Sequence, residues 1–282
     1  MALLLNHVEH VYGKGTAFEK VALYDINLQI NEGEFIGLIG HTGSGKSTLI
    51  QHLNGLLKPT DGGVYYNGED INEKGFSKKK LRSKVGIVFQ YPEQQLFETT
   101  VEKDVAFGLK HSGLSAAEKQ ARVRWALETV GFSFEKVHDQ PPMGLSGGEK
   151  RRVAIAGVIA MQPKCIVLDE PTAMLDPAGR REVIDTATKL CREQGITVVL
   201  ITHHMEECIG ADRVIVLSNG AIVADGAPKQ VFSQVDLLKK EGLTAPVTVR
   251  LLHALRAHGM DVPLDALTVS DCADAVAAAL KR

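Results

Sequence analysis

Residues 35–48, with the sequence FIGLIGHTGSGKST, join an apolar run directly to a glycine-rich loop. The run Phe35–Ile39 is short and continuously apolar, as expected of a strand that is covered on both faces. Residues 47–57 follow with the pattern of a helix. A strand, a glycine loop and a helix in this order arrange backbone N–H groups and a helix N-terminus around a phosphate group. The stretch therefore predicts an α/β fold that binds a phosphate-containing ligand.

This loop matches the pattern G-x-x-x-x-G-K-S of a phosphate-binding (Walker A) loop. In such a loop Lys46 would reach the β- and γ-phosphates, and the hydroxyl of Ser47 would bind Mg²⁺. An ordinary glycine-rich turn is the alternative, but the strand before the loop and the helix after it argue against this. The residues expected to contact the nucleotide are Gly40, His41, Thr42, Gly43, Ser44, Gly45, Lys46, Ser47 and Thr48.

Two adjacent carboxylates follow another apolar run, residues 165–168, which predicts a buried strand. At the end of such a strand (Walker B), Asp169 is expected to hold Mg²⁺ through water. Glu170 is then the candidate for orienting or deprotonating an attacking water, because the metal needs no second carboxylate. Two acids in a solvated turn are the alternative, which the upstream phosphate loop disfavours.

A second possible anion site begins at Leu145, where the sequence LSGGE opens a helix. Ser146, Gly147, Gly148 and Glu149 can present N–H groups and a hydroxyl to a phosphate, although an ordinary N-capped helix explains them equally well. One γ-phosphate needs only one such cradle, and the Walker A loop already provides it. A second cradle is useful if it serves a nucleotide held by another subunit.

Bulk properties limit the function classes. The chain has 282 residues and a net charge of −2, and its pI near 6.6 argues against a broad nucleic-acid-binding face. Four cysteines without metal-ligand spacing are expected to be buried in the interior. Because no stretch approaches the roughly 20 apolar residues of a membrane helix, any membrane span is expected to come from other chains.

The sequence divides into three parts. The apolar patterns predict strands within residues 3–30 and 62–71, and residues 101–160 are mostly helical and interrupt the α/β pattern. We expect residues 1–232 to form the nucleotide-binding domain, with 91–160 as a helical subdomain. Residues 233–282 are expected to form a small helical appendage. The basic run at 77–84 is interpreted as a solvated helix face.

Together these motifs resemble the ATP-binding-cassette (ABC) ATPases, whose signature is LSGGE. The resemblance covers about residues 3–230 and implies a RecA-like P-loop domain with an antiparallel β part and a helical insertion. It also implies that Tyr12 stacks on adenine, with Phe18 as a rival, and that Gln90 contacts Mg²⁺ and the membrane partner. It further places Asp176 at the interface between two subunits and His203 at the γ-phosphate, whereas His204 is taken as structural.

A narrower resemblance is to the ATPases of energy-coupling factor (ECF) transporters, carried by YPEQQLFE at 91–98 and RRVAIAG at 151–157. The sequence at 91–98 is most similar to that of the second ATPase of the pair (EcfA-prime), although Met174 departs from the glycine expected there. The resemblance implies ATP hydrolysis that powers uptake of vitamins or transition-metal ions, with ATP and Mg²⁺ as ligands. It places the chain at the cytoplasmic side of the cell membrane.

The implied partners are the other ATPase paralogue in a head-to-tail heterodimer, the transmembrane protein EcfT and substrate-binding S components, without nucleic acid. EcfT is expected to dock near residues 92–98, and the appendage to help hold the ATPase pair together. Three alternatives remain at this point: the ATPase of an ordinary ABC importer, a non-transport ABC ATPase acting on nucleic acid, and a subunit that binds ATP without hydrolysing it.

Overall fold

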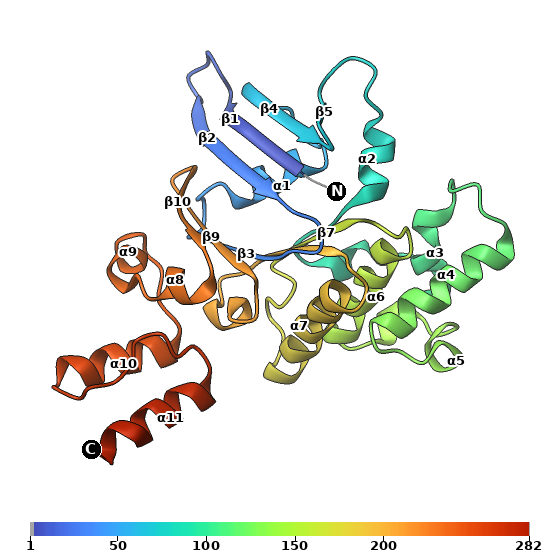
Figure 1. Cartoon of the computed structure of the whole chain (residues 1–282). Coiled ribbons are helices and arrows are strands. Elements are labelled where there is room, and N and C mark those ends of the chain that lie inside the picture. The colour runs from blue at the N-terminus through green and yellow to red at the C-terminus, as the bar shows by residue number, and fades with distance from the viewer. Residues whose placement is uncertain (1–2, 282) are drawn as a thin grey trace.

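A six-stranded sheet forms the centre of the protein, which this computed structural model describes over residues 3–281 (Figure 1). Its strand order is β10-β9-β3-β8-β7-β6, and all neighbours are parallel except β9 and β10. Every residue of β3, β7 and β8 is buried, which explains their continuous apolar sequences. The strands are β3 (Phe35–Ile39), β6 (Val85–Val88), β7 (Cys165–Asp169), β8 (Thr197–Ile201), β9 (Arg213–Ser218) and β10 (Ala221–Gly226).

A second, antiparallel sheet has the order β2-β1-β4-β5 and lies over the first (Figure 1). Its strands are β1 (Leu3–Tyr12), β2 (Lys20–Ile30), β4 (Asp61–Tyr66) and β5 (Glu69–Asp70). Helix α1 (Lys46–Leu53) is packed between the two sheets, where its apolar residues share one buried cluster with residues of both. The helix is shorter than predicted because the chain turns at Gly55, whose φ is 67°.

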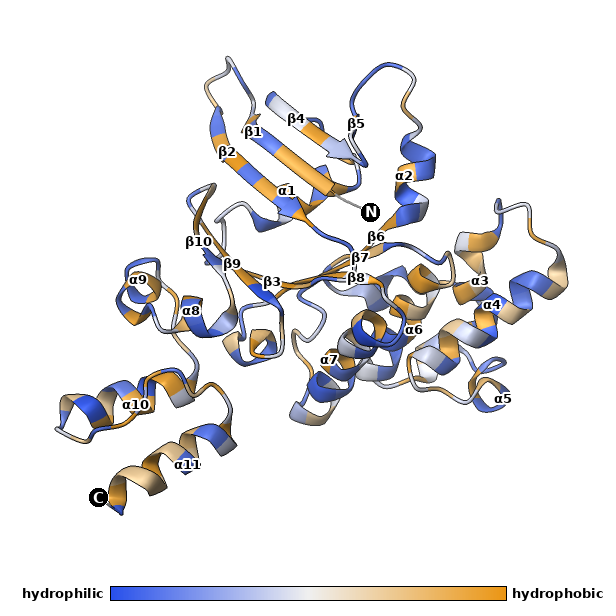
Figure 2. Ribbon diagram, viewed as in Figure 1, coloured by the Kyte–Doolittle hydropathy of each residue, from blue (hydrophilic) through white to orange (hydrophobic). Residues whose placement is uncertain are grey.

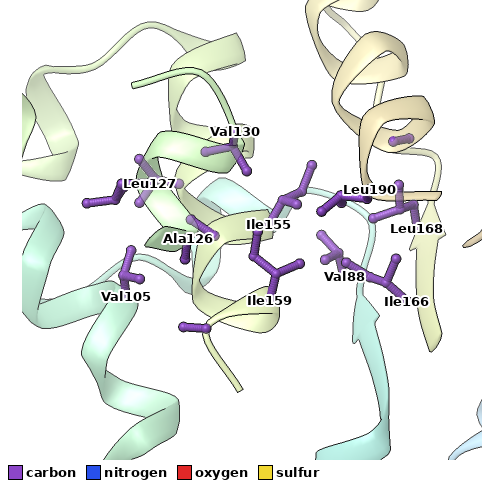
Figure 3. Close-up of a cluster of buried hydrophobic side chains, with 14 of the residues drawn as sticks. Val88, Val105, Ala126, Leu127, Val130, Ile155, Ile159, Ile166, Leu168 and Leu190 are labelled. Carbon is purple, nitrogen blue, oxygen red and sulfur yellow. The ribbon is translucent and has the colours of Figure 1, made fainter. Parts of the chain in front are cut away.

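Helices fill the segment between β6 and β7. They are α3 (Val101–Ala106), α4 (Ala116–Thr129), α5 (Phe134–Val137) and α6 (Gly147–Ile159), with short 3₁₀ turns η1 (Pro92–Gln95), η2 (Phe107–Leu109) and η3 (Pro142–Gly144). Val105, Leu127 and Ile155 of these helices belong to one buried cluster with Val88 and Ile166 of the central sheet (Figure 3). Helix α7 (Pro177–Arg192) packs beside α6. The helical segment therefore shares a core with the sheet.

Helix α2 (Lys78–Lys84) carries the basic run, and it buries only Leu81. The interpretation as a solvated helix face is thus confirmed. In Figure 2 the central strands are largely hydrophobic, whereas the outer surfaces of the helices carry many hydrophilic residues. The four cysteines are buried and unpaired, as expected. Among residues 3–281, no helix has both the length and the apolar character needed to cross a membrane.

Four helices end the described chain: α8 (Pro228–Phe232), α9 (Val235–Lys240), α10 (Val247–Ala257) and α11 (Val269–Leu280), following η4 (Met205–Cys208) and the β9–β10 hairpin. Phe232, Leu238 and Val249 pack against Ile39 and Val216 of the central sheet. Helices α10 and α11 enclose a small cluster of their own. The division at residue 232 stays a prediction, and Met1, Ala2 and Arg282 of the two predicted domain ranges lie outside the described residues.

Candidate nucleotide site

The candidate site lies where four parallel strands end. The glycine loop follows β3, Gln90 lies two residues after β6, Glu170 directly after β7, and His203 two residues after β8. Carboxyl ends of parallel strands meet at one edge of a sheet, where α/β proteins bind their ligands. A cavity of about 480 Å³ opens there. It is lined by Tyr12, Lys20, Ala22, Thr42, Gly43, Gly45, Lys46, Ser47, Thr48, Gln90, Glu170 and His203.

Two glycines fix the path of the phosphate loop. A side chain at Gly40 would come within 2.2 Å of the carbonyl oxygen of Leu217, so the loop can approach β9 only without one. Gly45, the N-cap of α1, has a φ of 106°, a conformation that favours glycine. The N–H groups in the first turn of α1 have no partner within the helix, and they favour an anion at the N-terminus of α1.

Lys46 is buried below this loop. Its Nζ donates hydrogen bonds to the carbonyl oxygens of Gly40 at 2.7 Å and His41 at 2.9 Å. Burial lowers the pKa of Lys46, and the nearby charges of Glu170 and Asp169 oppose that change. The hydroxyl of Ser44 is also buried and has no hydrogen-bond partner in the structure. A buried cation and an unpaired hydroxyl suit a loop that receives phosphate oxygens.

Asp169 ends β7 next to Lys46. Burial and the charge of Glu170 raise its pKa to about 6, and Lys46 acts in the opposite direction. A divalent cation at this position would favour the charged carboxylate. With the Ser47 hydroxyl and the Gln90 amide, Asp169 offers oxygen ligands of the kind that Mg²⁺ prefers. The residues present therefore fit Mg²⁺.

Glu170 is held from two sides. Its Oε2 accepts a hydrogen bond from Gln90 Nε2 at 2.8 Å, and its Oε1 lies 2.6 Å from His203 Nε2. Its φ is 48°, in the left-handed region that a residue with a side chain rarely adopts. Such strain is typical of residues that the surrounding structure holds for a function. The structure thus brings Glu170, Gln90 and His203 together at the cavity.

Tyr12 lines the cavity beside the phosphate loop. It ends β1, is 42% exposed, and its hydroxyl is hydrogen-bonded to Thr48 Oγ1 at 3.2 Å. Phe18, the rival aromatic, is 89% exposed and is not among the described residues that line the cavity. Gly40, His41 and Ser44 belong to the phosphate loop without lining the cavity. His204 faces α7, where its Nδ1 lies 3.5 Å from Arg180 Nη1.

The LSGGE residues lie elsewhere. Ser146 caps α6: its Oγ accepts from the Glu149 backbone N–H at 3.3 Å and donates to Glu149 Oε2 at 2.7 Å. Asp176 caps α7 in the same region, because Gly148 packs against Gly179 of the first turn of α7. Within residues 3–281, neither Asp176 nor any residue from Ser146 to Glu149 lines the cavity. The predicted residues therefore form two separate groups.

Some site residues were missed by sequence reasoning. Lys20 and Ala22 of β2 line the cavity, because the β1–β2 register places Lys20 opposite Tyr12. No local motif marks them, and a hairpin register depends on a loop whose geometry the sequence left open. The buried pair His10 and His52 behind Tyr12 was also missed. A histidine on an apolar strand carries no signal without knowledge of its neighbour.

Comparison with known proteins defines the class first. The sequence model of the ABC transporter family matches residues 23–173. The chain also resembles a solved structure described as cbiO1 from Clostridium perfringens, part of the ABC transporter complex cbiONQ. That resemblance has a TM-score of 0.77 and 38% sequence identity, and it covers 91% of this chain and 98% of the other.

Two relatives make the assignment narrower. The energy-coupling factor transporter ATP-binding protein EcfA1 of Caldanaerobacter subterraneus is 52% identical over 96% of this chain and 98% of its own length. EcfA2 of Clostridium perfringens is 48% identical over 98% of this chain and 97% of its own length. The chain belongs to the ABC ATPases and, within them, to the ATP-binding proteins of ECF transporters.

This membership confirms the expected class of function. The chain is the ATP-binding, ATP-hydrolysing subunit of a membrane transporter, and the ABC nucleotide-binding fold is the one that the sequence predicted. The three alternatives, an ordinary importer ATPase, a nucleic-acid-directed ABC protein and a non-hydrolysing subunit, find no support in these relatives.

Proposed function

We propose that the cavity at the strand ends binds MgATP and that Glu170 acts on the attacking water. One observation carries this proposal: Glu170 is held between Gln90 and His203, and all three line the same cavity as Lys46. Lys46, Ser47 and the N–H groups of the loop bind the phosphates, and the ring of Tyr12 stacks on adenine. Mg²⁺, held by Asp169, Ser47 and Gln90, would offset negative charge on the phosphate groups.

The chemistry is positional and electrostatic, because phosphoryl transfer requires alignment and charge stabilisation rather than a covalent intermediate. Each oxygen of Glu170 has one partner, Gln90 or His203, and keeps a second lone pair with which it can orient a water. A γ-phosphate near His203 would draw this imidazole towards itself and free Oε1 of Glu170. Nucleotide binding would then prepare Glu170 to act as the general base.

We infer that Ser146–Glu149 serve a nucleotide on a partner subunit. Their separation from the cavity supports this, as does the exposure of Ser146 and Gly147 at the capped N-terminus of α6. Asp176 lies beside them at the start of α7 and would meet the partner's equivalent residue. The chain would therefore act as half of a head-to-tail dimer.

The partner ATPase is inferred to be the other ECF paralogue. Relatives of both kinds, EcfA2 and EcfA1, match this chain at similar identity. The sequence of residues 91–98, which resembles EcfA-prime, supports the assignment of this chain as the second ATPase of the pair. The remaining partners are an EcfT-type transmembrane protein and S components, at the cytoplasmic side of the cell membrane. They fit the description of cbiO1 as part of a transporter complex.

We propose that EcfT docks in a groove beside η1. There Leu96, Phe97, Phe107 and Gly157 line a cavity of about 170 Å³. Phe97 and Phe107 are 62% and 50% exposed, and their rings meet edge to face at 4.9 Å. Exposed aromatic side chains rimming a groove are typical of interaction sites.

The test is affinity purification of the tagged chain from membranes. Wild type should bring down an EcfT-type protein and small membrane subunits, whereas Phe97→Asp should lose them. Phe18→Asp changes an aromatic residue in another loop that is even more exposed than Phe97; it is the matched control and should retain them. Recovery of the membrane subunits of an importer that uses a solute-binding protein would contradict the proposed partners. Recovery of equal amounts of the membrane subunits with wild type and Phe97→Asp would contradict the assignment of this groove.

A further inference from the structure

Two buried histidines connect the antiparallel sheet to the phosphate-loop helix. His10 on β1 is 7% exposed, and His52 on α1 is fully buried. His52 Nε2 lies 3.1 Å from His10 Nδ1. Neither residue touches the cavity, and neither has a part in the hydrolysis described above. A buried imidazole pair without an ion-pair partner needs another explanation, because burying polar groups is unfavourable unless they are paired.

The directions of the hydrogen bonds follow from one carbonyl group. His52 Nδ1 lies 2.7 Å from the backbone oxygen of Thr48, which can only accept, so His52 carries its proton on Nδ1. The Nε2 of neutral His52 is then an acceptor, and His10 Nδ1 must donate to it. Only this arrangement satisfies both contacts with neutral rings. The bonds thus run from His10 through His52 to the backbone of Thr48.

A second contact joins the same two elements. The hydroxyls of Tyr12 and Thr48 are hydrogen-bonded at 3.2 Å. His10 and Tyr12 are two residues apart on a strand, which spans about 6.7 Å. Thr48 and His52 are four residues apart on a helix, which spans about 6 Å on one face. The two spacings match, so β1 and α1 are joined by two polar contacts, one at each end of this short segment.

His10 also supports the ring of Tyr12. The two rings meet edge to face, with centroids 4.5 Å apart and an interplanar angle of 69°. His10 contacts His52 in a similar way, at 4.9 Å and 76°. Such contacts restrict the rotation of an aromatic ring. The ring of Tyr12 is therefore fixed from behind, while its other side is open to the cavity.

Charge on the pair is suppressed by its surroundings. Burial lowers the pKa of both histidines, that of His52 to about 4, and the carbonyls of Thr48 and Lys58 act in the opposite direction. The neighbouring ring adds a further lowering at His52. Both rings are therefore neutral at neutral pH, which is the state that the hydrogen-bond arrangement requires.

We propose that His10 and His52 are positioning residues that set the distance between the base-binding ring of Tyr12 and the phosphate loop. A nucleotide contacts both walls at once, but Tyr12 belongs to one sheet and the loop to the other. The two contacts between β1 and α1 join these walls directly. This inference rests on the proposed function, because it requires that Tyr12 binds the base.

The test compares two ligands on the full-length chain. ATP contacts both walls, whereas inorganic tripolyphosphate contacts only the phosphate loop. Isothermal titration calorimetry in the presence of Mg²⁺ gives both affinities at neutral pH. Tyr12→Phe removes only the hydroxyl and keeps the ring, and His52→Gln removes the imidazole contact. Each change should weaken ATP about five- to tenfold, the usual effect of one lost hydrogen bond, and leave tripolyphosphate within about twofold.

The chain offers a matched control for His52. His258 makes the same ring-to-carbonyl contact four residues back, with Ala254 at 2.8 Å, but it lies exposed at the end of α10. His258→Gln should change neither affinity. An unchanged ratio of the two affinities in Tyr12→Phe and His52→Gln, or equal weakening of both ligands, would overturn the proposal. If His52→Gln does not fold, as judged by circular dichroism, His10→Gln, which removes the other ring of the pair, takes its place in the same comparison.

Tyr12→Ala separates this inference from the proposed function. If this variant leaves the affinity ratio unchanged, the base does not bind at Tyr12 and the proposed site itself is wrong. If it lowers the ratio while Tyr12→Phe and His52→Gln do not, the base site stands and only the positioning role of the histidines is wrong.

Discussion

Glu170 Oε1 lies 2.6 Å from His203 Nε2, so the candidate base and the candidate γ-phosphate ligand contact each other. Gln90 occupies the other oxygen of Glu170 at 2.8 Å. In this arrangement each oxygen of Glu170 has one partner and keeps a second acceptor position for a water. Movement of His203 or Gln90 away from Glu170 would open a further position on that oxygen to the attacking water.

Glu170→Gln should keep ATP binding and lower turnover about 100-fold or more, because an amide cannot accept the proton of water. The stalled protein should accumulate as an ATP-bound dimer. Phosphate release measures the first effect, and light scattering with ATP measures the second. Glu193→Gln, which makes the same carboxylate-to-amide change at an exposed residue at the end of α7, is the control. Near-normal turnover of the Glu170 variant would remove this residue from the role.

Ser146→Arg should block the nucleotide site of the partner rather than the site of its own chain. A composite site can be tested by combining it with Lys46→Ala. With both changes in one subunit, both sites are lost and hydrolysis should disappear. With Lys46→Ala in one subunit and the equivalent signature change in the other, one site stays intact and hydrolysis should persist.

The opposite pattern in these assembled dimers would place the signature and the phosphate loop of one chain in the same site. Differently tagged subunits, purified in tandem, ensure that only the intended combinations are assayed. Unmodified dimers prepared in the same way give the reference rate.

Asp169→Asn should reduce the Mg²⁺ dependence of ATP binding. The variant lacks the charge that holds a cation beside the phosphates. For wild type, the dissociation constant of ATP should rise when the metal is chelated. For Asp169→Asn, the values with Mg²⁺ and with chelator should be similar. An unchanged metal dependence would show that Asp169 does not help to hold the ion.

Stability should fall as the pH drops from about 6.5 to about 4. The unfolded chain protonates His52 near its ordinary pKa of 6.5, whereas the folded chain does so only near 4. Within this window the unfolded state binds more protons, so the free energy of unfolding decreases, by about 3 kcal/mol from this residue. Above pH 6.5 His52 is neutral in both states and contributes no pH dependence.

Urea unfolding at several pH values checks this prediction. His52→Gln should show a flatter profile between pH 6.5 and 4 than wild type, whatever its absolute stability. Other groups titrate in the same range, so the difference between the two profiles isolates His52. Parallel profiles would mean that His52 keeps an ordinary pKa in the folded protein.

Much of the fold could be predicted because several signals are local. The apolar runs at Phe35–Ile39 and 165–168 became buried parallel strands. Asn67 and Gly68, a residue pair typical of tight turns, have φ values of 52° and 86°. Ser115 and Glu118 have the spacing of a capping box and form one reciprocally. Each of these features depends on neighbouring residues, so its physical cause can be read from the sequence.

Features that join distant segments were not predictable in this way. The Glu170 contacts with Gln90 and His203 span three strand ends, and the pair His10 and His52 joins a strand to a helix. Lys20 reaches the cavity only through the β1–β2 register. Sequence spacing does not encode these distances. The first set depends on the strand order of the central sheet, and the histidine pair depends on the packing of α1 against the antiparallel sheet.

The sequence by itself determined the class of this protein, because the phosphate loop, the carboxylates after β7 and LSGGE each require particular residues at fixed local spacing. Tertiary structure alone decided how those residues are divided. It placed Glu170, Gln90 and His203 around one cavity, and it placed Ser146 and Asp176 on a separate surface. The physical reason is that strand order and helix packing, rather than position along the chain, determine which side chains share a space.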